Sequence, residues 1–257
     1  MLLAIDVGNT NVVFGVYNGK KLLRMWRISS GAERTVDEYE VIIRGLLSES
    51  GLNGRSVNAM ISCSVVPRIM PMLKGALKRI FKVAPCNVGE DVGVPIKNLY
   101  NDPRQVGQDR LVDAYAAKIK YGVPAIVVDY GTAITFDVIS KRGEYTGGLI
   151  VPGIEISLEA LSSRAALLPR IELTKPKELL GRDTINSMRS GILFGYGALT
   201  DGLVKKLCKT YVKDSNVIAT GGNAELVATY CTTIDYIDSN LTLDGLSYIY
   251  NTIRKKS

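Results

Sequence analysis

The sequence predicts an α/β protein composed of two similar halves, each built around a mixed sheet. An apolar run ends at Asp6, a glycine follows at Gly8, and the polar residues 9–11 lead into a second apolar run, 12–17. Nearly the same design returns 123 residues later, at residues 126–138. Each copy is typical of a strand, a short turn and a second strand, and helical segments follow both copies. The repeat therefore indicates an internal duplication at the scale of a domain.

A chain of 257 residues can bury two cores of modest size. The second copy of the pattern begins just after Gly122-Val123-Pro124, which is where we expect the two halves to meet. The sequence therefore predicts an N-terminal domain at residues 1–122 and a C-terminal domain at residues 123–257.

The first half is expected to begin with three antiparallel strands and to continue with alternating helices and strands. Asn18-Gly19 suits a two-residue hairpin turn, and Thr35 with Glu38 forms the capping box that begins a helix. The other expected elements are a buried strand at 57–63, a helix from Pro67 to Ile80 with the proline in its first turn, a long irregular segment at 83–109 and a helix after Arg110.

The second half repeats the three strands and adds more helix. Strands are expected at 125–129, 133–139, 145–150, 217–219 and near Ile234, and a C-terminal helix carries Leu243, Leu246 and Ile249.

The composition limits the possible chemistry. The chain has no histidine, so acid–base catalysis must use Asp, Glu, Lys, Tyr or Cys, and serine–histidine triads are excluded. The four cysteines show no C-x-x-C pairing, which indicates reduced thiols and not a zinc site or disulfides. The formal net charge of +7 favours anionic ligands, although it serves solubility equally well. No basic cluster interleaved with aromatic residues indicates a nucleic-acid partner.

No signal peptide and no membrane anchor are expected. The first apolar residues stop at Asp6, and no apolar run approaches the roughly 18 residues of a membrane span. A cytoplasmic protein is the expectation.

The turn after Asp6 has the composition of a phosphate-binding loop. Gly8 lets backbone N–H groups approach phosphate oxygens, Asn9, Thr10 and Asn11 add donors, and Asp6 can hold a hydrated Mg²⁺. A single turn of this kind fits an ordinary polar β-turn better. The second copy, Asp129 with Gly131 and Thr132, reverses that preference, because two such turns facing one site could clamp a polyphosphate.

Two further positions each allow two interpretations. Asp109 precedes a predicted helix, where it suits an N-cap, and it is also a candidate general base with Arg110 beside it. From spacing alone the N-cap is favoured. The pair Gly221-Gly222 follows a predicted strand and either turns the chain or permits close approach of a ligand. Gly195-Tyr196-Gly197 follows a helix-like segment and is interpreted as a helix-packing site.

A series of motifs in order along nearly the whole chain resembles the type III pantothenate kinases. They are residues 6–11 (Asp-Val-Gly-Asn-Thr-Asn), 64–67 (Ser-Val-Val-Pro), Tyr100 with Asp102-Pro103, 106–110 (Val-Gly-Gln-Asp-Arg), 129–133 (Asp-Tyr-Gly-Thr-Ala), 145–148 (Tyr-Thr-Gly-Gly), Pro152-Gly153, Thr184 with Ser187-Met188, and 220–222 (Thr-Gly-Gly). Each motif alone is weak, and the combination is specific.

The resemblance implies two ribonuclease-H-like domains of the actin-like ATPase fold and ATP-dependent phosphorylation of pantothenate, the first step of coenzyme A biosynthesis. It implies that ATP is bound by Asp6, Val7, Gly8, Asn9, Thr10, Asn11, Val12, Val13 and Thr132. Asp109 would be the catalytic base, and pantothenate would be held by Tyr100, Gly107, Gln108, Asp109, Arg110 and Thr184. The resemblance also implies a homodimer, Mg²⁺ with the ATP, and a monovalent cation, K⁺ or NH₄⁺, at Asp129.

The chain departs from the family pattern at Asp113, Tyr130, Ile134, Val151 and Arg182-Asp183, none of which is assigned to the chemistry. Asp183 and Thr184 both suit a helix cap, which makes Thr184 the least secure assignment. Two alternatives stay open: a non-catalytic regulatory relative of the kind described as transcription accessory factors, and a kinase for another small hydroxyl acceptor.

Overall fold

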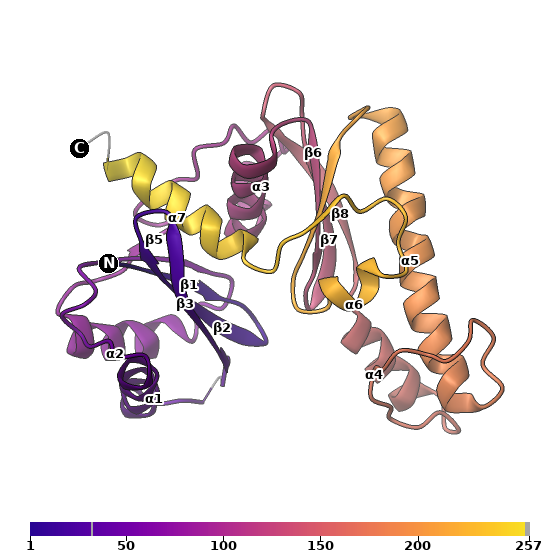
Figure 1. The fold of residues 1–257 in the computed structure, drawn as a ribbon, viewed down its shortest axis with the longest axis horizontal. Helices are drawn as coiled ribbons and strands as arrows, with labels where there is room; N and C mark the ends of the chain where they lie inside the picture. Colours follow the sequence, from indigo (N-terminus) through magenta and orange to yellow (C-terminus); the bar gives the residue numbers. More distant parts are fainter. Residues whose placement is uncertain (32, 255–257) are drawn as a thin grey trace. The chain divides into compact units, whose positions relative to one another are not determined.

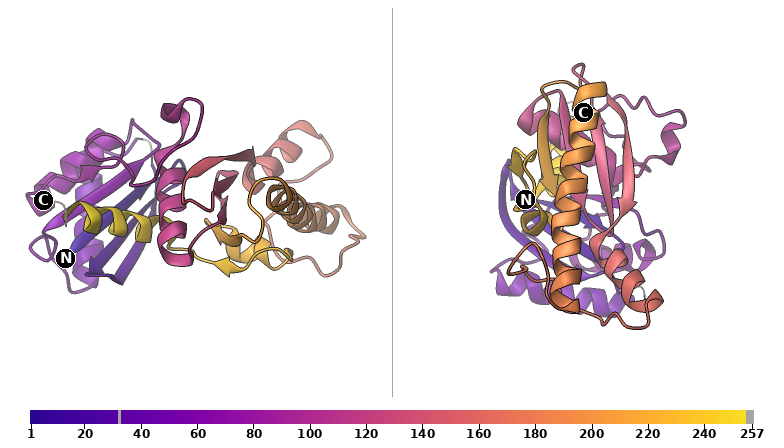
Figure 2. Two further views of the ribbon diagram at one scale, coloured as in Figure 1. Left: turned by 90° about the horizontal axis from the view of Figure 1, so that it is seen from above. Right: turned by 90° about the vertical axis from the view of Figure 1, so that its right-hand side faces the viewer.

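The computed structural model describes residues 1–31 and 33–254, which form two compact units (Figures 1 and 2). The first unit contains Met1–Ile96, Arg104–Ala116 and the segment that begins at Leu241. The second contains Lys97–Pro103 and Ala117–Asn240. Compared with a single cut after residue 122, residues 97–103 and 117–122 belong to the second unit and the C-terminal helix belongs to the first.

The first unit is built on a five-stranded mixed sheet in the order β3-β2-β1-β4-β5. Strand β1 is antiparallel to β2 and parallel to β4. The strands are β1 (Leu2–Val7), β2 (Asn11–Asn18), β3 (Lys21–Ser29), β4 (Ala59–Ser64) and β5 (Cys86–Asn87).

Helices cover both faces of this sheet, because successive side chains of a strand point to opposite faces. Leu3, Ile5 and Val7 pack into a core with α1 (Val36–Glu49) and α2 (Met70–Phe81), which lie side by side in Figure 1. Leu2 and Ala4 pack on the other face with side chains of α3 (Gln108–Tyr121) and α7 (Leu241–Arg254).

The second unit has the same sheet order, β8-β7-β6-β9-β10. Its main core joins β6, β7 and β9 to α4, α5 and α6, of which α5 is drawn in orange in Figure 1. The elements are β6 (Ala125–Tyr130), β7 (Ala133–Ile139), β8 (Tyr145–Pro152), α4 (Ile154–Arg164), α5 (Thr184–Thr210), β9 (Asn216–Thr220), α6 (Ala224–Ala228) and β10 (Tyr236–Ile237).

The two sheets confirm the predicted duplicated α/β fold. Strands β1 and β6 share one sequence of burial, with four buried residues, a half-buried aspartate and another buried residue. The turns that follow differ by one residue, because Val7 pairs with Val12 whereas Tyr130 pairs with Ile134. The copies therefore share their sheets and differ in the length of this turn.

Several predicted boundaries were wrong. Pro67 lies before α2, which begins at Met70 with Pro71 in its first turn. The irregular segment contains β5 and a short 3₁₀ helix, Pro103–Gln105, and the last strand lies at residues 236–237 and not at Ile234. The capping box of α1 is confirmed, since the N–H of Glu38 donates to the Thr35 hydroxyl and the N–H of Thr35 donates to the Glu38 carboxylate.

No helix within the described ranges is long and apolar enough to span a membrane.

Candidate active site

The turn between β1 and β2 is held by backbone and by a serine that the sequence did not single out. The N–H of Gly8 donates to the carbonyl of Asn11 at 2.9 Å, which closes the turn. Ser30, at the end of β3, donates its N–H to the Thr10 carbonyl at 2.8 Å and its hydroxyl to the Gly8 carbonyl. Asn9 and Thr10 are exposed. The loop therefore has a fixed backbone with polar side chains facing solvent, as a phosphate-binding turn requires.

Ser30 is itself fixed from a helix. It is only 4% exposed, and its carbonyl accepts the hydroxyl of Tyr39 in α1 at 2.8 Å. Tyr39 thereby connects the core under α1 to the turn. The capping box that begins α1 near residue 35 is the only sequence signal that bears on this arrangement, because it places Tyr39 in the first helical turns.

The negative charges of three carboxylates act on one buried thiol in the first unit. Cys63 in β4 is paired in register with Asp6 in β1. Burial raises the pKa of the Cys63 thiol, and the negative charges of Asp6, Asp109 and Asp113 raise it further. The Cys63 thiol therefore experiences the charge of the aspartate of the predicted nucleotide turn and the charge of the predicted base. Asp113 lies one helical turn after Asp109 and is buried.

Asp109 lies inside the first turn of α3, which begins at Gln108, so the expectation that it precedes the helix as its N-cap was wrong. Its Oδ1 accepts the N–H of Arg110 at 2.8 Å. Burial raises the pKa of Asp109, and the backbone N–H and guanidinium of Arg110 offset part of that rise. A carboxylate with a raised pKa is a stronger proton acceptor than an ordinary one.

Gly107 leaves the space that the Asp109 carboxylate occupies. A Cβ added at Gly107 would lie less than 3.0 Å from Oδ1 of Asp109. Gln108 packs its side chain against Gly89, another position where a Cβ would collide. Residues 107–109 are therefore fixed by close packing on two sides.

In the second unit a glycine cradle surrounds Asp129. Gly221 has φ +92°, and a Cβ there would overlap Oδ1 of Asp129. A Cβ at Gly131 would lie 3.4 Å from Oδ2. The group that approaches Gly221 is the carboxylate of Asp129 and not a ligand, so the two interpretations of the pair Gly221-Gly222 stay open.

Thr132 and Tyr100 lie in the same unit. The Thr132 side chain is exposed, and its carbonyl lies against Gly153, the N-cap of α4, where no side chain fits. Tyr100 is half-buried, with its ring 6.5 Å from that of Tyr145 between centroids.

The packing of Gly197 against Tyr230 supports the interpretation of residues 195–197 as a helix-packing site.

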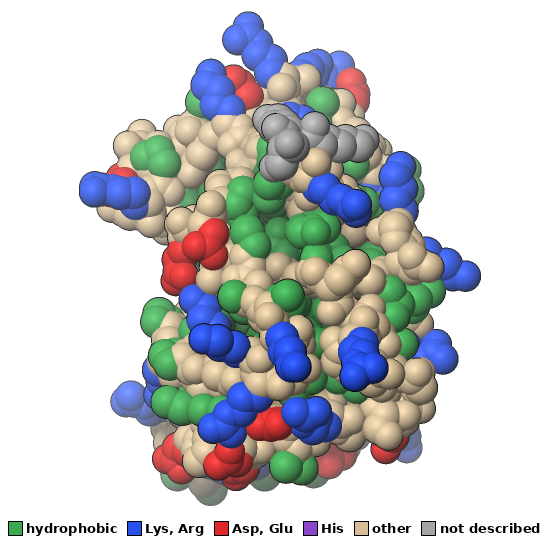
Figure 3. Space-filling model, turned by 90° about the vertical axis from the view of Figure 1, so that its left-hand side faces the viewer, with side chains coloured by type: hydrophobic (Ala, Val, Ile, Leu, Met, Phe, Trp, Pro, Cys, Tyr) green, Lys and Arg blue, Asp and Glu red, His purple; other side chains and the backbone are tan. Residues whose placement is uncertain are grey.

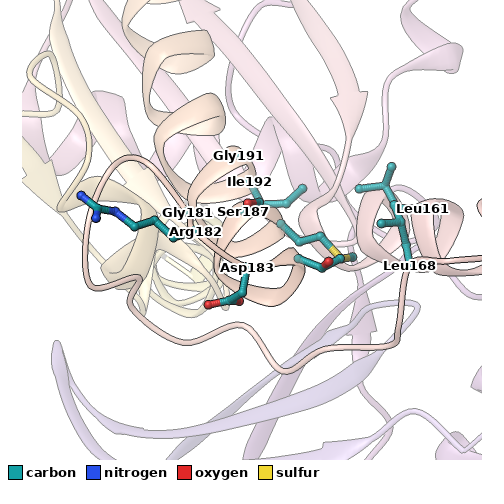
Figure 4. A pocket seen from close by; sticks show the side chains of 10 residues that line it. Leu161, Leu168, Gly181, Arg182, Asp183, Ser187, Gly191 and Ile192 are labelled. Atoms are coloured by element: carbon teal, nitrogen blue, oxygen red, sulfur yellow. The ribbon is translucent and has the colours of Figure 1, made fainter.

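Thr184 lines a pocket of about 750 Å³ at the start of α5 (Figure 4). Asp183 is the N-cap, because its Oδ1 accepts the N–H of Asn186 at 2.8 Å. The hydrogen bond from the backbone N–H of Asn186 is the largest cause of the lowered pKa of Asp183. Asp183 therefore takes the capping role for which both residues were candidates, and Thr184 is exposed at the pocket. The other lining residues are Leu161, Leu168, Gly181, Arg182, Ser187, Met188, Gly191 and Ile192.

The donor set fits hydrated or phosphate-bound cations and not a closed metal cage. Within residues 1–31 and 33–254, no group of three or more Cys, Asp or Glu side chains could hold a metal ion. Asp6 and Asp129 each present a carboxylate at the end of a strand. Mg²⁺ is commonly bound by one or two carboxylates with water and phosphate oxygens, so Asp6 suits it. At Asp129, the space left by the absent side chains of Gly131 and Gly221 is taken by the carboxylate itself.

The positive charge of the chain is visible on the face drawn in Figure 3, where lysine and arginine side chains stand out among fewer acidic ones. Ion pairs such as Lys74 with Glu90 and Arg79 with Asp37 use part of this charge. It therefore contributes a general attraction for anions and does not locate a site.

The fold and these two aspartate-led turns define a class of protein, the actin-like and sugar-kinase ATPase folds. Solved structures with this fold include a putative Baf family transcriptional activator from Campylobacter jejuni (TM-score 0.63, 19% identity, 98% of this chain and 99% of that chain). Another is a putative 2-dehydro-3-deoxygalactonokinase from Sinorhizobium meliloti (TM-score 0.59, 10% identity, 98% and 97%).

The sequence identifies the family within that class. The family model for type III pantothenate kinase matches residues 2–206. A type III pantothenate kinase from Halalkalibacterium halodurans is 46% identical over 250 residues, covering 97% of this chain and 98% of the relative. The chain belongs to the type III pantothenate kinase family.

Proposed function

We propose that this chain transfers the γ-phosphoryl group of ATP to the hydroxyl of pantothenate, with Asp109 as the general base. Membership of the family supports the reaction. The observation that supports the residue assignment is the environment of Cys63, which is paired in register with Asp6 and whose pKa is raised by burial and by the charges of Asp6 and Asp109.

The proposed chemistry needs mainly positioning and charge neutralisation. Asp109 accepts the proton of the acceptor hydroxyl as that oxygen attacks the γ-phosphorus, and the bond to the β-phosphate oxygen breaks. Oδ1 of Asp109 is already oriented by the Arg110 N–H, which leaves Oδ2 as the oxygen for the incoming hydroxyl. Arg110 supplies a positive charge for the carboxylate of pantothenate.

The turn residues Asp6 to Val13 are proposed to bind ATP, together with Thr132. Their support is the arrangement of Ser30, which fixes the loop backbone while the Asn9 and Thr10 side chains stay exposed. Pantothenate is proposed to contact Tyr100, residues 107–110 and Thr184.

Two cations complete the proposal. Mg²⁺ near Asp6 screens the phosphates, and K⁺ or NH₄⁺ is held at Asp129, whose carboxylate lies near the end of β6 against Gly131 and Gly221. A cytoplasmic location is proposed with them, since ATP and K⁺ are abundant there.

We also propose a homodimer. The region around the Thr184 pocket exposes large apolar side chains, with Leu167 93%, Leu179 67%, Leu180 73% and Ile185 41% exposed. Burial of such a patch by a second copy is a common reason for its exposure. Sedimentation equilibrium tests the dimer, and a monomer at all concentrations would contradict it.

The reaction is tested by ATP consumption with pantothenate and with a panel of other hydroxyl acceptors, in K⁺ and in Na⁺ buffers. Pantothenate should be preferred and K⁺ required. Asp109→Asn should lower kcat by about 10²–10⁴ with the fold intact, whereas the exposed Asp37→Asn serves as the control. Preference for another acceptor would replace the substrate, and no turnover with any acceptor would favour a regulatory relative.

A further inference from the structure

The backbone of the segment that carries Tyr100 is hydrogen-bonded to Tyr145 in the second sheet. The N–H of Tyr145 donates to the Lys97 carbonyl and the N–H of Leu99 donates to the Tyr145 carbonyl, both at 2.8 Å. The N–H of Tyr100 then donates to Oδ1 of Asn98 at 2.9 Å. The backbone around Tyr100 is therefore set by the position of Tyr145 in β8.

The side chain of Tyr100 rests on the same strand. Its ring is tilted by 42° to that of Tyr145, at 6.5 Å between centroids. A Cβ added at Gly147 would lie 3.8 Å from two ring carbons of Tyr100, so the ring lies over the glycine backbone. The orientation of the Tyr100 ring thus depends on how firmly Tyr145 is held.

A buried carboxylate holds Tyr145. The Tyr145 hydroxyl donates to Oδ1 of Asp137 at 2.8 Å, and the Thr135 hydroxyl donates to Oδ2 at 2.9 Å. Tyr145 is 0% exposed and Asp137 is 1% exposed. Hydrogen bonds to a carboxylate away from water are stronger than neutral ones, so this bond restricts the Tyr145 ring.

We propose that Asp137 and Tyr145 are positioning residues for the acceptor, acting through Tyr100. Asp137 fixes Tyr145, and Tyr145 fixes both the backbone and the ring of Tyr100. The proposal rests on the proposed function, because it takes Tyr100 to contact pantothenate. Neither Asp137 nor Tyr145 touches the substrate in this scheme, so both affect acceptor binding and not the phosphoryl transfer step.

The test compares Tyr145→Phe, Tyr100→Ala and the double variant by steady-state kinetics. Tyr145→Phe should raise the KM for pantothenate about 5- to 30-fold, with kcat and the KM for ATP within about twofold. The double variant should match Tyr100→Ala alone, because Tyr145 can position only a ring that is present. Multiplicative effects on KM in the double variant, or an unchanged KM in Tyr145→Phe, would overturn the proposal.

Tyr17→Phe is the matched control. Tyr17 is 1% exposed and its hydroxyl donates to an Asp244 carboxylate oxygen at 2.8 Å, but it lies in the first unit. The Tyr17→Phe variant should lower the melting temperature about as much as Tyr145→Phe and leave the KM for pantothenate unchanged. A similar rise in KM in Tyr17→Phe would show a general loss of stability and would overturn the positioning role.

Two further results distinguish a variant that does not fold, a wrong positioning role and a wrong reaction from one another. If Tyr145→Phe does not fold, Tyr145→Phe with Asp137→Asn removes the buried charge, and the KM for pantothenate should still be raised. If Tyr100→Ala leaves that KM unchanged, the proposed contact of Tyr100 is wrong and the positioning role falls with it, whereas the Asp109→Asn result still decides the reaction itself.

Discussion

Gly107→Ala is the sharpest test of the position of the base, because it leaves Asp109 in the sequence and moves its carboxylate. Ala is acceptable to the backbone, since Gly107 does not have a positive φ. Its Cβ would lie less than 3.0 Å from Oδ1 of Asp109, whereas ordinary contacts begin at 3.4 Å. The obstructed group is the end of a side chain, so it can turn away at little cost to stability.

The carboxylate must therefore move by about 1 Å, and a misplacement of that size costs about 10²-fold in rate. We expect kcat to fall by about that factor while the free energy of unfolding changes by less than about 1 kcal/mol. Initial rates at saturating ATP and pantothenate, with thermal unfolding of the same samples, measure both. Gly93→Ala is the control, because a Cβ there meets nothing within 4 Å. Wild-type kcat in folded Gly107→Ala would refute the assignment of Asp109.

Three other predictions concern the base, the nucleotide turn and the cation. Burial raises the pKa of Asp109 above 3.8, and the base must be deprotonated, so kcat should fall as the pH drops through that raised pKa. If the residual activity of Asp109→Asn showed the same fall of kcat at low pH, this prediction would be contradicted. Ser30→Ala removes the hydrogen bond to the Gly8 carbonyl and should raise the KM for ATP about 2- to 12-fold, the worth of one such bond; an unchanged KM for ATP would count against the turn. Gly221→Ala, at φ +92° and against Asp129, should cost at least about 1–2 kcal/mol of stability and abolish the difference between K⁺ and Na⁺ buffers; retention of that difference would argue against a cation at Asp129.

The duplicated fold could be predicted because its signals are local. An apolar strand that ends in Asp-x-Gly, followed by a second strand, appears twice, and Thr35 with Glu38 marks the start of a helix. Strand β5 could not be predicted, because it consists only of Cys86 and Asn87 and depends on pairing with β4. Short strands of this kind are defined by their partners and not by their own sequence.

The candidate site was predictable by residue and much less by geometry. Asp6 and Asp109 could be named from their motifs, but Cys63, on whose thiol both charges act, lies in β4 and outside both motifs. Ser30 gave no signal at all, because a serine at a strand end is common and its two bonds to the turn arise only when β3 pairs with β2. Such contacts join residues far apart in the sequence, which periodicity and turn chemistry do not describe.

The return of α7 to the first unit sets an order for synthesis on the ribosome. Leu243, Leu246 and Ile249 cover the face of the first sheet that carries Leu2 and Ala4. Side chains of α3 cover part of that face early. The part that α7 covers stays open to chaperones while more than 200 residues emerge, for about 10–40 s at usual elongation rates. The second unit, which is largely one uninterrupted stretch, can fold during that interval. A stop codon just before residue 241 should therefore yield a folded second unit joined to a first unit that cannot finish folding.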